Sequence, residues 1–118
     1  MVISNEYPWP PKELSPNRRI FWRKKNPIKR QYRDMATLTT KPMRLTDAQK
    51  NSRMSAKVTF CPPDNRNRDW DNLVASCKTL FDGMCIRLGI DDKQIKQISI
   101  NFGEKVKDGC VRVDLTLP

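Results

Sequence analysis

One segment of the sequence, from Asp69 to Gly89, limits the fold more than any other. Its apolar side chains recur every three or four residues, the spacing of one helix face: Leu73, Cys77, Leu80 or Phe81, Met84 and Leu88. Asp69 is a typical N-cap residue, Asn72 follows it as a capping-box amide would, and Gly89 stands where a left-handed C-terminal cap is expected. The pattern predicts one amphipathic helix from about Trp70 to Leu88, with a core against one side of it.

Alternating apolar and polar residues on both sides of this helix predict β-strands. Ser55 to Cys61 alternates before the helix, whereas Ile95 to Gly103 and Cys110 to Leu117 alternate after it. A short polar segment joins the last two, so we expect them to form a hairpin. Val2 to Trp9 is predicted as a further strand, at the edge of the sheet because two prolines follow it.

A second helical pattern begins at Pro27, a favoured first helical residue after a cap such as Asn26. Its apolar face contains Ile28, Tyr32, Met35 and Leu38 or Thr39. The predicted order is therefore β-α-β-α-β-β, an α/β (α+β) fold with a small mixed β-sheet and helices packed on it. The length of 118 residues fits a single domain over residues 1–118, and so small a chain gains stability from forming a homodimer.

The charge distribution predicts a polyanionic partner. Residues 1–60 carry fourteen Lys or Arg and four Asp or Glu, so they supply the whole net charge of +10, whereas residues 61–118 carry nine of each sign. Such a surface attracts nucleic acid through phosphate contacts and counterion release. An anionic membrane would also suit the charge, but no strongly amphipathic helix supports it. The residues expected to contact DNA are Arg18, Arg19, Arg23, Lys24, Lys25, Lys29, Arg30, Arg66 and Arg68.

Several other classes of protein fit the sequence poorly. No run approaches the roughly 18 apolar residues of a membrane-spanning helix. Residues 1–11 lack the pattern of a secretory signal, so we expect a cytoplasmic, nucleoid-associated protein. The four cysteines form no CxxC pair and there is no histidine, which argues against structural zinc. We expect these cysteines to be reduced and buried.

The segment from Pro62 to Leu73 places carboxylates beside arginines at the start of the long helix. Without histidine, phosphodiester hydrolysis is best served by a divalent metal ion that carboxylates hold. Asp69, Asp71 and Asp92 are candidate ligands, and Lys78 is a candidate cation for the charge that develops on phosphate. The two ends of such a helix lie roughly 30 Å apart. Asp91 and Asp92 follow the far end of this helix. A single site with Asp69 and Asp71 therefore needs a shorter or bent helix, a second aspartate pair that folds back, or a dimer partner.

These residues also have simpler structural interpretations. Asp69 could serve only as the helix cap, and the second aspartate pair could be a solvated turn. Lys78 could form a weak surface pair with Asp82, four residues further on. Trp70 is more typical of a packed core than of a DNA-stacking site. From these residues alone, a metal-dependent nuclease and a non-catalytic basic binding protein are both open.

Three ordered pieces resemble the signature of RusA-type Holliday junction resolvases: Arg68-Asp69-Trp70-Asp71-Asn72-Leu73, Lys78-Thr79-Leu80-Phe81-Asp82-Gly83 and Gly89-Ile90-Asp91-Asp92-Lys93-Gln94-Ile95. Tyr7-Pro8-Trp9-Pro10-Pro11 and Pro62-Pro63-Asp64 resemble the family's first strand and the lead-in to its signature. The resemblance extends from about residue 7 to the final strands. It implies a small basic homodimer that nicks four-way DNA junctions symmetrically with Mg²⁺, or Mn²⁺, in DNA recombination and repair, often in prophages.

The resemblance also assigns roles to residues. It makes Asp69, Asp71 and Asp92 catalytic and metal-binding, and Lys78 the family's helix lysine. The family lysine follows the second aspartate by four residues, where this chain has Ala75, so Lys78 fits only with a small insertion, one turn further along the same helix face. Asn67 also replaces a common arginine. A binding protein that has lost activity, and a nuclease for flaps or replication forks, are the alternatives.

Overall fold

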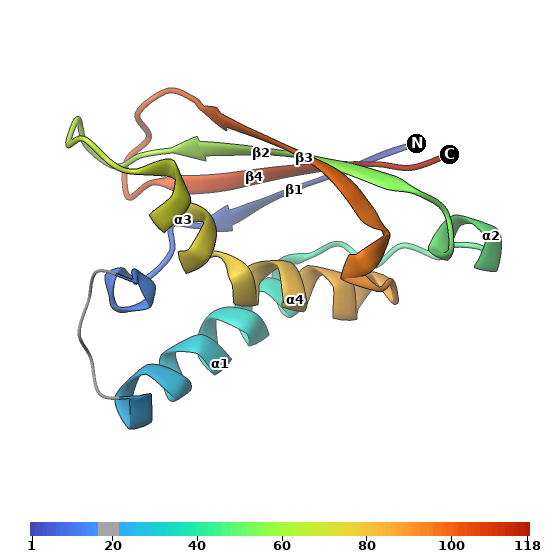
Figure 1. Cartoon of the computed structure of the whole chain (residues 1–118), viewed down its shortest axis with the longest axis horizontal. Coiled ribbons are helices and arrows are strands. Elements are labelled where there is room, and N and C mark those ends of the chain that lie inside the picture. The colour runs from blue at the N-terminus through green and yellow to red at the C-terminus, as the bar shows by residue number, and fades with distance from the viewer. Residues whose placement is uncertain (17–21) are drawn as a thin grey trace.

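A computed structural model describes residues 1–16 and 22–118, which form a sheet with helices on one face (Figure 1). The strands are β1 (Val2–Pro8), β2 (Met54–Cys61), β3 (Ile95–Phe102) and β4 (Cys110–Thr116). The helices are α1 (Trp22–Thr39), α2 (Asp47–Lys50), α3 (Trp70–Ser76) and α4 (Lys78–Leu88), with 3-10 turns η1 (Lys12–Leu14) and η2 (Asp92–Gln94). The predicted mixed sheet with helices packed on it is confirmed. Within the described ranges, no helix combines the length and the apolarity needed to cross a membrane.

The sheet has the order β1-β4-β2-β3, in which β4 is antiparallel to both neighbours and β3 is parallel to β2. The predicted hairpin between the last two strands is therefore wrong, because β2 lies between them. The connection from β3 to β4 is bonded to the end of β2: Gly103 N donates to the Phe60 carbonyl (2.8 Å), and Val106 N donates to that of Pro62 (2.9 Å). The edge position predicted for β1 is confirmed.

These pairings decide which loops lie together. Because β4 is antiparallel to β1 and β2, the strands β1, β2 and β3 all run in one direction. Their carboxyl ends share one end of the sheet, where β4 begins. The segment after Pro8, the loop after Cys61 and the connection after Phe102 therefore gather there, whereas η2 lies at the opposite end, before β3 (Figure 1).

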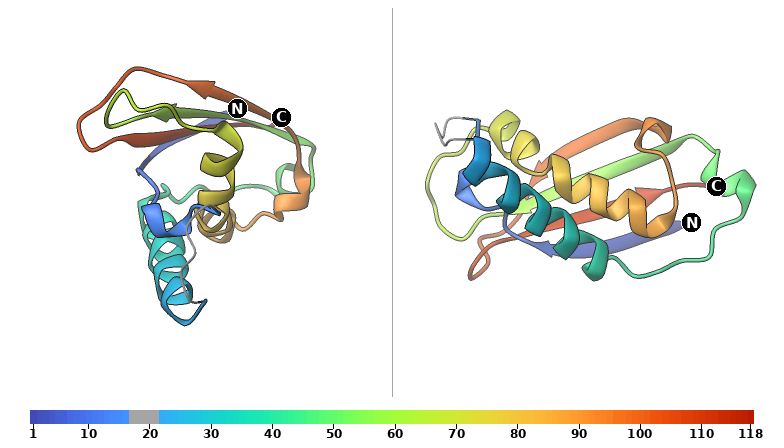
Figure 2. Two further views of the ribbon diagram at one scale, coloured as in Figure 1. Left: turned by 60° about the vertical axis from the view of Figure 1, so that its left-hand side comes forward. Right: turned by 90° about the horizontal axis from the view of Figure 1, so that it is seen from below.

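Helix α1 is already helical at Trp22 and contains Pro27, so the predicted start at Pro27 is wrong. The expected apolar face is confirmed at its centre, where Tyr32 is buried, but Leu38 is 78% exposed. The buried face continues through Ala36 and Thr40 instead. A spacing of four residues keeps these side chains on the core side of the helix. The N-terminal half of α1 extends away from the sheet (Figures 1 and 2).

The contact between α1 and α4 depends on Gly83. A Cβ at this position would lie 2.3 Å from the Arg33 carbonyl oxygen and 2.9 Å from the Ala36 Cβ. The hydroxyl of Thr37 donates to the Gly83 carbonyl (3.3 Å) across the same contact. Only glycine allows the two helices to approach this closely, so this contact fixes α4 against α1.

The long helix predicted from Trp70 to Leu88 is divided into α3 and α4 by a turn at Cys77 (φ −97°, ψ 6°). Its predicted apolar stripe is nevertheless confirmed: Leu73, Cys77, Leu80, Met84 and Leu88 are all buried. The chain bends at Cys77, so two differently directed segments both keep their apolar side toward the sheet (Figure 1). The cap at Gly89 is confirmed by its left-handed backbone (φ 68°, ψ 33°). All four cysteines are free and buried, as expected.

Candidate active site

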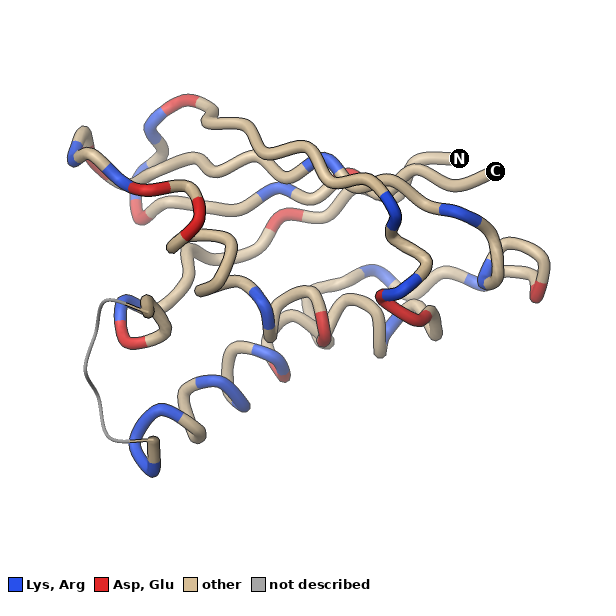
Figure 3. Tube along the Cα trace, viewed as in Figure 1, with Lys and Arg blue, Asp and Glu red and all other residues tan. Residues whose placement is uncertain are grey.

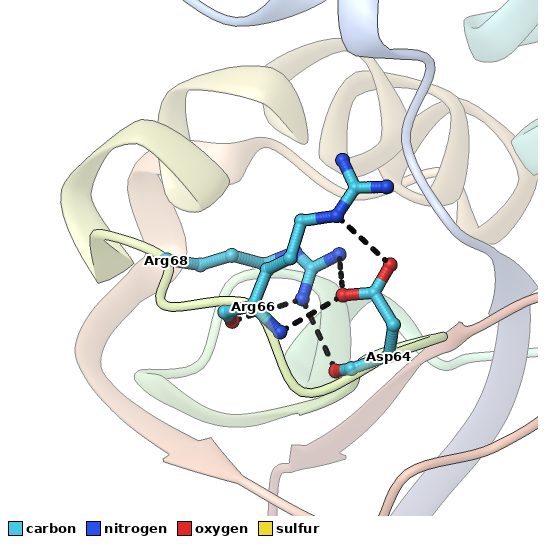
Figure 4. Close-up of polar contacts among 3 residues, drawn as sticks. All are labelled: Asp64, Arg66 and Arg68. Carbon is cyan, nitrogen blue, oxygen red and sulfur yellow. Dashed lines mark hydrogen bonds and ion pairs between the residues drawn. The ribbon is translucent and has the colours of Figure 1, made fainter.

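The loop between β2 and α3 is organised by the carboxylate of Asp64 (Figure 4). Asp64 Oδ1 accepts from Arg66 N (3.0 Å) and pairs with Arg68 Nη2 (2.8 Å), while Oδ2 pairs with Arg66 Nε (3.5 Å). The backbone N–H of Arg66, followed by the contacts with Arg68, lowers the pKa of Asp64 below its ordinary value of 3.8. Asp64 thus contacts two of the arginines predicted to contact DNA.

The two arginines differ in how freely they can reach a ligand. The Arg68 side chain is 16% exposed, and its guanidinium also donates to the Asp64 and Arg66 carbonyls (3.3 and 3.2 Å). It lies over the Trp9 ring, 5.3 Å from the ring centroid. The Arg66 side chain is 84% exposed. Arg68 is therefore held as part of the loop, whereas Arg66 is available to a phosphate.

Asp69 and Asp71 follow this loop at the start of α3, and both are exposed. Asp69 is the N-cap residue, as predicted, but its side chain makes no hydrogen bond to the helix backbone. Its Oδ2 instead accepts from Asn72 Nδ2 (3.4 Å), while Asp71 Oδ1 accepts from Asn72 N (3.0 Å). Within residues 1–16 and 22–118, neither carboxylate forms an ion pair. Both therefore keep oxygen atoms available to a ligand.

Trp70, between these two aspartates, is 59% exposed. The interpretation of this tryptophan as a packed core residue is therefore wrong. The first turn of α3 turns Leu73, not Trp70, toward the core, and Leu73 is 8% exposed. An indole side chain thus projects into solvent beside the two carboxylates.

Asp91 and Asp92 lie at the other end of α4. Asp91 Oδ1 accepts from Lys93 N (3.0 Å) at the start of η2, and this hydrogen bond is the main cause that lowers the pKa of Asp91. Together with Asp82, both aspartates line an open hollow of about 500 Å³. The nearby thiol of Cys85 has a pKa raised to about 12, first by burial and then by the negative charges of Asp92, Asp82 and Asp91.

Lys78 is the first residue of α4 and is exposed. The turn at Cys77 places it in a different helix from Asp71, so the two do not share one continuous helix face as predicted. Lys78 lines a groove of about 390 Å³ with Lys25 and Lys29 of α1 and with Asp82. No ion pair joins Lys78 to Asp82 in the described part of the chain.

Three hollows follow one another along α3 and α4. The first contains Asp69 and Ser76, the second contains Ser76, Lys78 and Asp82, and the third contains Asp82 and Asp92. Neighbouring hollows share a lining residue, Ser76 or Asp82, and we refer to this row of hollows as the path along α3 and α4; lysines line its middle. This path is suited to a nucleic-acid strand, because the lysines can contact its phosphates.

The predicted DNA-binding cations of α1 lie on its projecting half, where blue positions follow one another in Figure 3. Arg23, Lys24, Lys29 and Arg30 are exposed, and Lys25 is half-buried. Arg23 lies 5.4 Å from the centroid of the exposed Trp22 ring. Arg18 and Arg19 fall outside the described residues. The described cations therefore make the N-terminal half of α1 a basic surface, and Lys25 and Lys29 of this surface line the path along α3 and α4.

One chain does not gather the three predicted ligands. No cluster of three or more acidic or cysteine residues in residues 1–16 and 22–118 is arranged to hold a metal ion. Asp69 and Asp71 follow the carboxyl end of β2, whereas Asp92 precedes the first residue of β3. The paired strands run from Met54–Ile95 to Phe60–Phe102, about 20 Å at the usual rise per residue. Asp92 is thus on the far side of the molecule from the other two.

Comparison with known proteins identifies the family of this chain. The family model described as Endodeoxyribonuclease RusA matches residues 8–117, nearly the whole chain. The chain belongs to the RusA family. It is also 33% identical over 111 residues to an uncharacterized protein from Xylella fastidiosa (strain Temecula1 / ATCC 700964), a match that covers 92% of this chain and 72% of that protein. Membership of the RusA family supports a nuclease of DNA recombination, with DNA as its substrate.

Several residues at this site had no predicted functional role. Trp9 and Asp64 contact the loop of Arg66 and Arg68, and Lys12 lies in the hollow beside Asp69. Asp82 was predicted as a possible surface partner of Lys78 and as part of the RusA-like signature, and it lines the hollow with Asp91 and Asp92. Asp64 was detectable from its spacing, because an acid two and four residues before two arginines is suited to such a clamp. Trp9 was predicted only as part of the segment that resembles the family's first strand, because its contact with Arg68 joins distant parts of the chain.

Proposed function

We propose that this chain is a Mg²⁺-dependent, structure-selective endonuclease that resolves four-way DNA junctions by paired symmetric nicks, acting at the cytoplasmic nucleoid. The observation that supports it most is the pair of exposed carboxylates, Asp69 and Asp71, which form no ion pair within the described residues and directly follow the Arg66–Arg68 loop. Two carboxylates beside a phosphate-binding loop would repel DNA by themselves. A divalent cation held by these two carboxylates would remove that repulsion.

The chemistry of the donors suits such a cation. Carboxylate oxygens are hard ligands of the kind that Mg²⁺ and Mn²⁺ prefer. Asp69 and Asp71 would hold the ion, which supplies an activated water and neutralises charge on the transferred phosphate. The guanidinium of Arg66 binds the adjacent phosphate, and Lys25, Lys29 and Lys78 hold the strand further along the path.

We further propose a homodimer in which Asp92 of one subunit joins Asp69 and Asp71 of the other. Within one chain these residues lie at opposite ends of the sheet, so a second copy is the simplest source of the third carboxylate. Strand β3 offers an apolar surface for that copy. Ile98 and Phe102 pair with Ala56 and Phe60 of β2 and therefore face the helix side of the sheet, yet they are 54% and 52% exposed.

The dimer also suits the DNA. A four-way junction has two-fold symmetry, and an isologous dimer presents two equal sites to it. The edge of β3 that faces away from β2 is unpaired in the described chain, and exposed strand edges are normally covered. Burial of Ile98 and Phe102 against a second subunit would remove this exposed apolar face from water.

Cleavage of a synthetic four-way junction tests the nuclease. We expect paired symmetric nicks on denaturing gels with Mg²⁺ or Mn²⁺, and none with EDTA. Asp71→Asn should retain junction binding and lose cleavage, while the matched Asp47→Asn, at the exposed start of α2, should retain both. Binding without nicks in the wild-type protein would support the non-catalytic binding protein instead. Faster cleavage of flaps or forks would replace the junction as the substrate.

A further inference from the structure

A cavity lies directly beside Asp69 at the end of the sheet where β1 and β2 finish. Its volume is about 560 Å³, within the roughly 300–1,000 Å³ of small-ligand pockets. Trp9, Pro10, Pro11 and Leu73 give it an apolar wall, whereas Lys12, Arg66 and Arg68 give it positive charge. Amide groups from Asn67 and Asn72 also line it. It therefore combines a flat apolar wall, hydrogen-bonding groups and cations next to a carboxylate of the proposed metal site.

The wall of the cavity is held rigidly. Trp9 meets the buried Phe60 edge to face, with ring centroids 6.1 Å apart at 79°. The backbone of Gly109 approaches the indole so closely that a Cβ there would lie 3.0 Å from two Trp9 carbons. Arg68 lies over the same ring, and Asp64 in turn fixes Arg68. Trp9 and Arg68 thus form a preorganised stack at the cavity.

We propose that this cavity receives one unstacked base of the DNA strand whose phosphate lies at Asp69, and that the Trp9–Arg68 stack is the surface on which the base packs. The inference rests on the proposed function. Bases in single-stranded or branched DNA stack on aromatic rings and guanidinium planes, while cations beside them hold the phosphates. Arg66 and Lys12 are the cations at this cavity, and the amides of Asn67 and Asn72 are suited to the edge of a base.

Such a base contact would make the Trp9–Arg68 stack a determinant of where the junction is cut. The cavity adjoins Asp69, so the nucleotide it holds is next to the phosphate that is cleaved. A base that fits the cavity would place its own phosphate at the metal-binding carboxylates, and a base that does not fit would leave it displaced. Preference for a nucleotide at the cut would then arise from the cavity.

Binding measured in EDTA tests the proposal without cleavage. An abasic nucleotide is moved through the positions that flank the crossover, and the Kd of each junction is measured for the wild-type protein and for Trp9→Leu. At one position the abasic nucleotide should weaken wild-type binding by about five- to a hundredfold, the usual effect of losing one stacked base. Trp9→Leu should weaken binding of intact DNA similarly and show no further loss with that abasic junction.

Controls separate this result from damage to the fold. Trp9→Phe, which keeps an aromatic ring, should retain part of the abasic effect. Trp22→Leu, on α1 and away from the cavity, should retain all of it. Because Trp9 packs on Phe60, Asn67→Ala at the exposed rim provides a second variant, and it should reduce the abasic effect while the Tm stays unchanged.

Other results would overturn the inference. Independent, additive losses from Trp9→Leu and the abasic nucleotide at every position would show that no base meets Trp9. A different result could come from junctions in which a neutral methylphosphonate replaces one phosphate. If Trp9→Leu removed the loss of affinity caused by the methylphosphonate, but not the loss caused by the abasic nucleotide, the cavity would bind the DNA backbone instead of a base. If the wild-type protein bound no branched DNA at all, the proposed function itself would fail, which is a distinct outcome.

Discussion

Two acidic regions lie at opposite ends of the α3–α4 segment and have different surroundings. Asp69 and Asp71 follow a clamped arginine loop and adjoin a cavity with aromatic and cationic walls. Asp91 and Asp92 share an open hollow with Asp82, and no arginine in residues 1–16 or 22–118 lines it. The first region brings carboxylates and arginines together, as the proposed metal and phosphate contacts require, whereas the second gathers three carboxylates with Lys93 and Lys96 near Asp91. This difference is in line with the proposal that the second region completes the first in a dimer.

The largest effect on DNA cleavage is expected from substitutions in the two acidic regions. Asp71→Asn and Asp92→Asn should each slow junction nicking at least about a hundredfold, because each would remove a proposed ligand of the metal ion that stabilises the transition state. If each active site uses both subunits, mixing the two variants should restore nicking in about a quarter of the sites. Nicking rates of the separate and mixed variants measure this. If the subunits exchange and the mixture stays inactive, Asp71 and Asp92 of the same subunit must serve the same active site.

The α3–α4 segment that joins the two ends should be sensitive to packing at Gly83. Gly83→Ala places a methyl group against the Arg33 carbonyl and Ala36, and overpacking of this kind costs about 1–3 kcal/mol of unfolding free energy. Urea denaturation would give this value. Ile86→Ala, an exposed position one turn away on α4, is the control and should change stability little. Equal losses in the two variants would contradict the close approach of α1 and α4.

The lysines that line the hollow between the two acidic regions should contribute to DNA affinity but not to metal binding. Replacing both Lys25 and Lys29 with alanine should weaken junction binding and lower the slope of log Kd against log salt by roughly one per lost phosphate contact. Fluorescence anisotropy across a salt series would measure it. A matched double variant, Lys57→Ala with Arg112→Ala, removes the same charge from the outer face of the sheet. An equal fall in its slope would show that net charge alone decides affinity.

The smallest effect, a change in thermal stability, is expected at Asp64, the carboxylate that contacts the arginine loop before Asp69 and Asp71. Because the folded protein lowers the pKa of Asp64, the ionised clamp stabilises the fold above the ordinary value of 3.8 and is lost as pH falls below it. The Tm of Asp64→Asn should therefore lie below that of the wild type at pH 7, and the difference should shrink below pH 3.8. Thermal melts across this range measure it. A difference that stays constant with pH would exclude a role for the charge of Asp64.

Much of the local structure followed from sequence patterns. The stripe from Leu73 to Leu88, the cap at Gly89 and all four strands were predicted, since each depends on neighbours a few residues away. The strand order was not predictable in the same way. An alternating segment such as β4 fits between any two partners, and its place beside β2 is fixed only when the whole sheet forms.

The sequence by itself determined the composition of the candidate site: two aspartates after an arginine-rich loop, a second aspartate pair and a basic N-terminal half. The tertiary structure decided how these parts lie. The turn at Cys77 moved Lys78 off the helix of Asp71, and the parallel β2–β3 pairing put Asp92 at the far end of the sheet. It also brought Trp9 to Arg68. Helix breaks, strand neighbours and contacts across the chain depend on which surfaces exclude water together, and that depends on the whole fold.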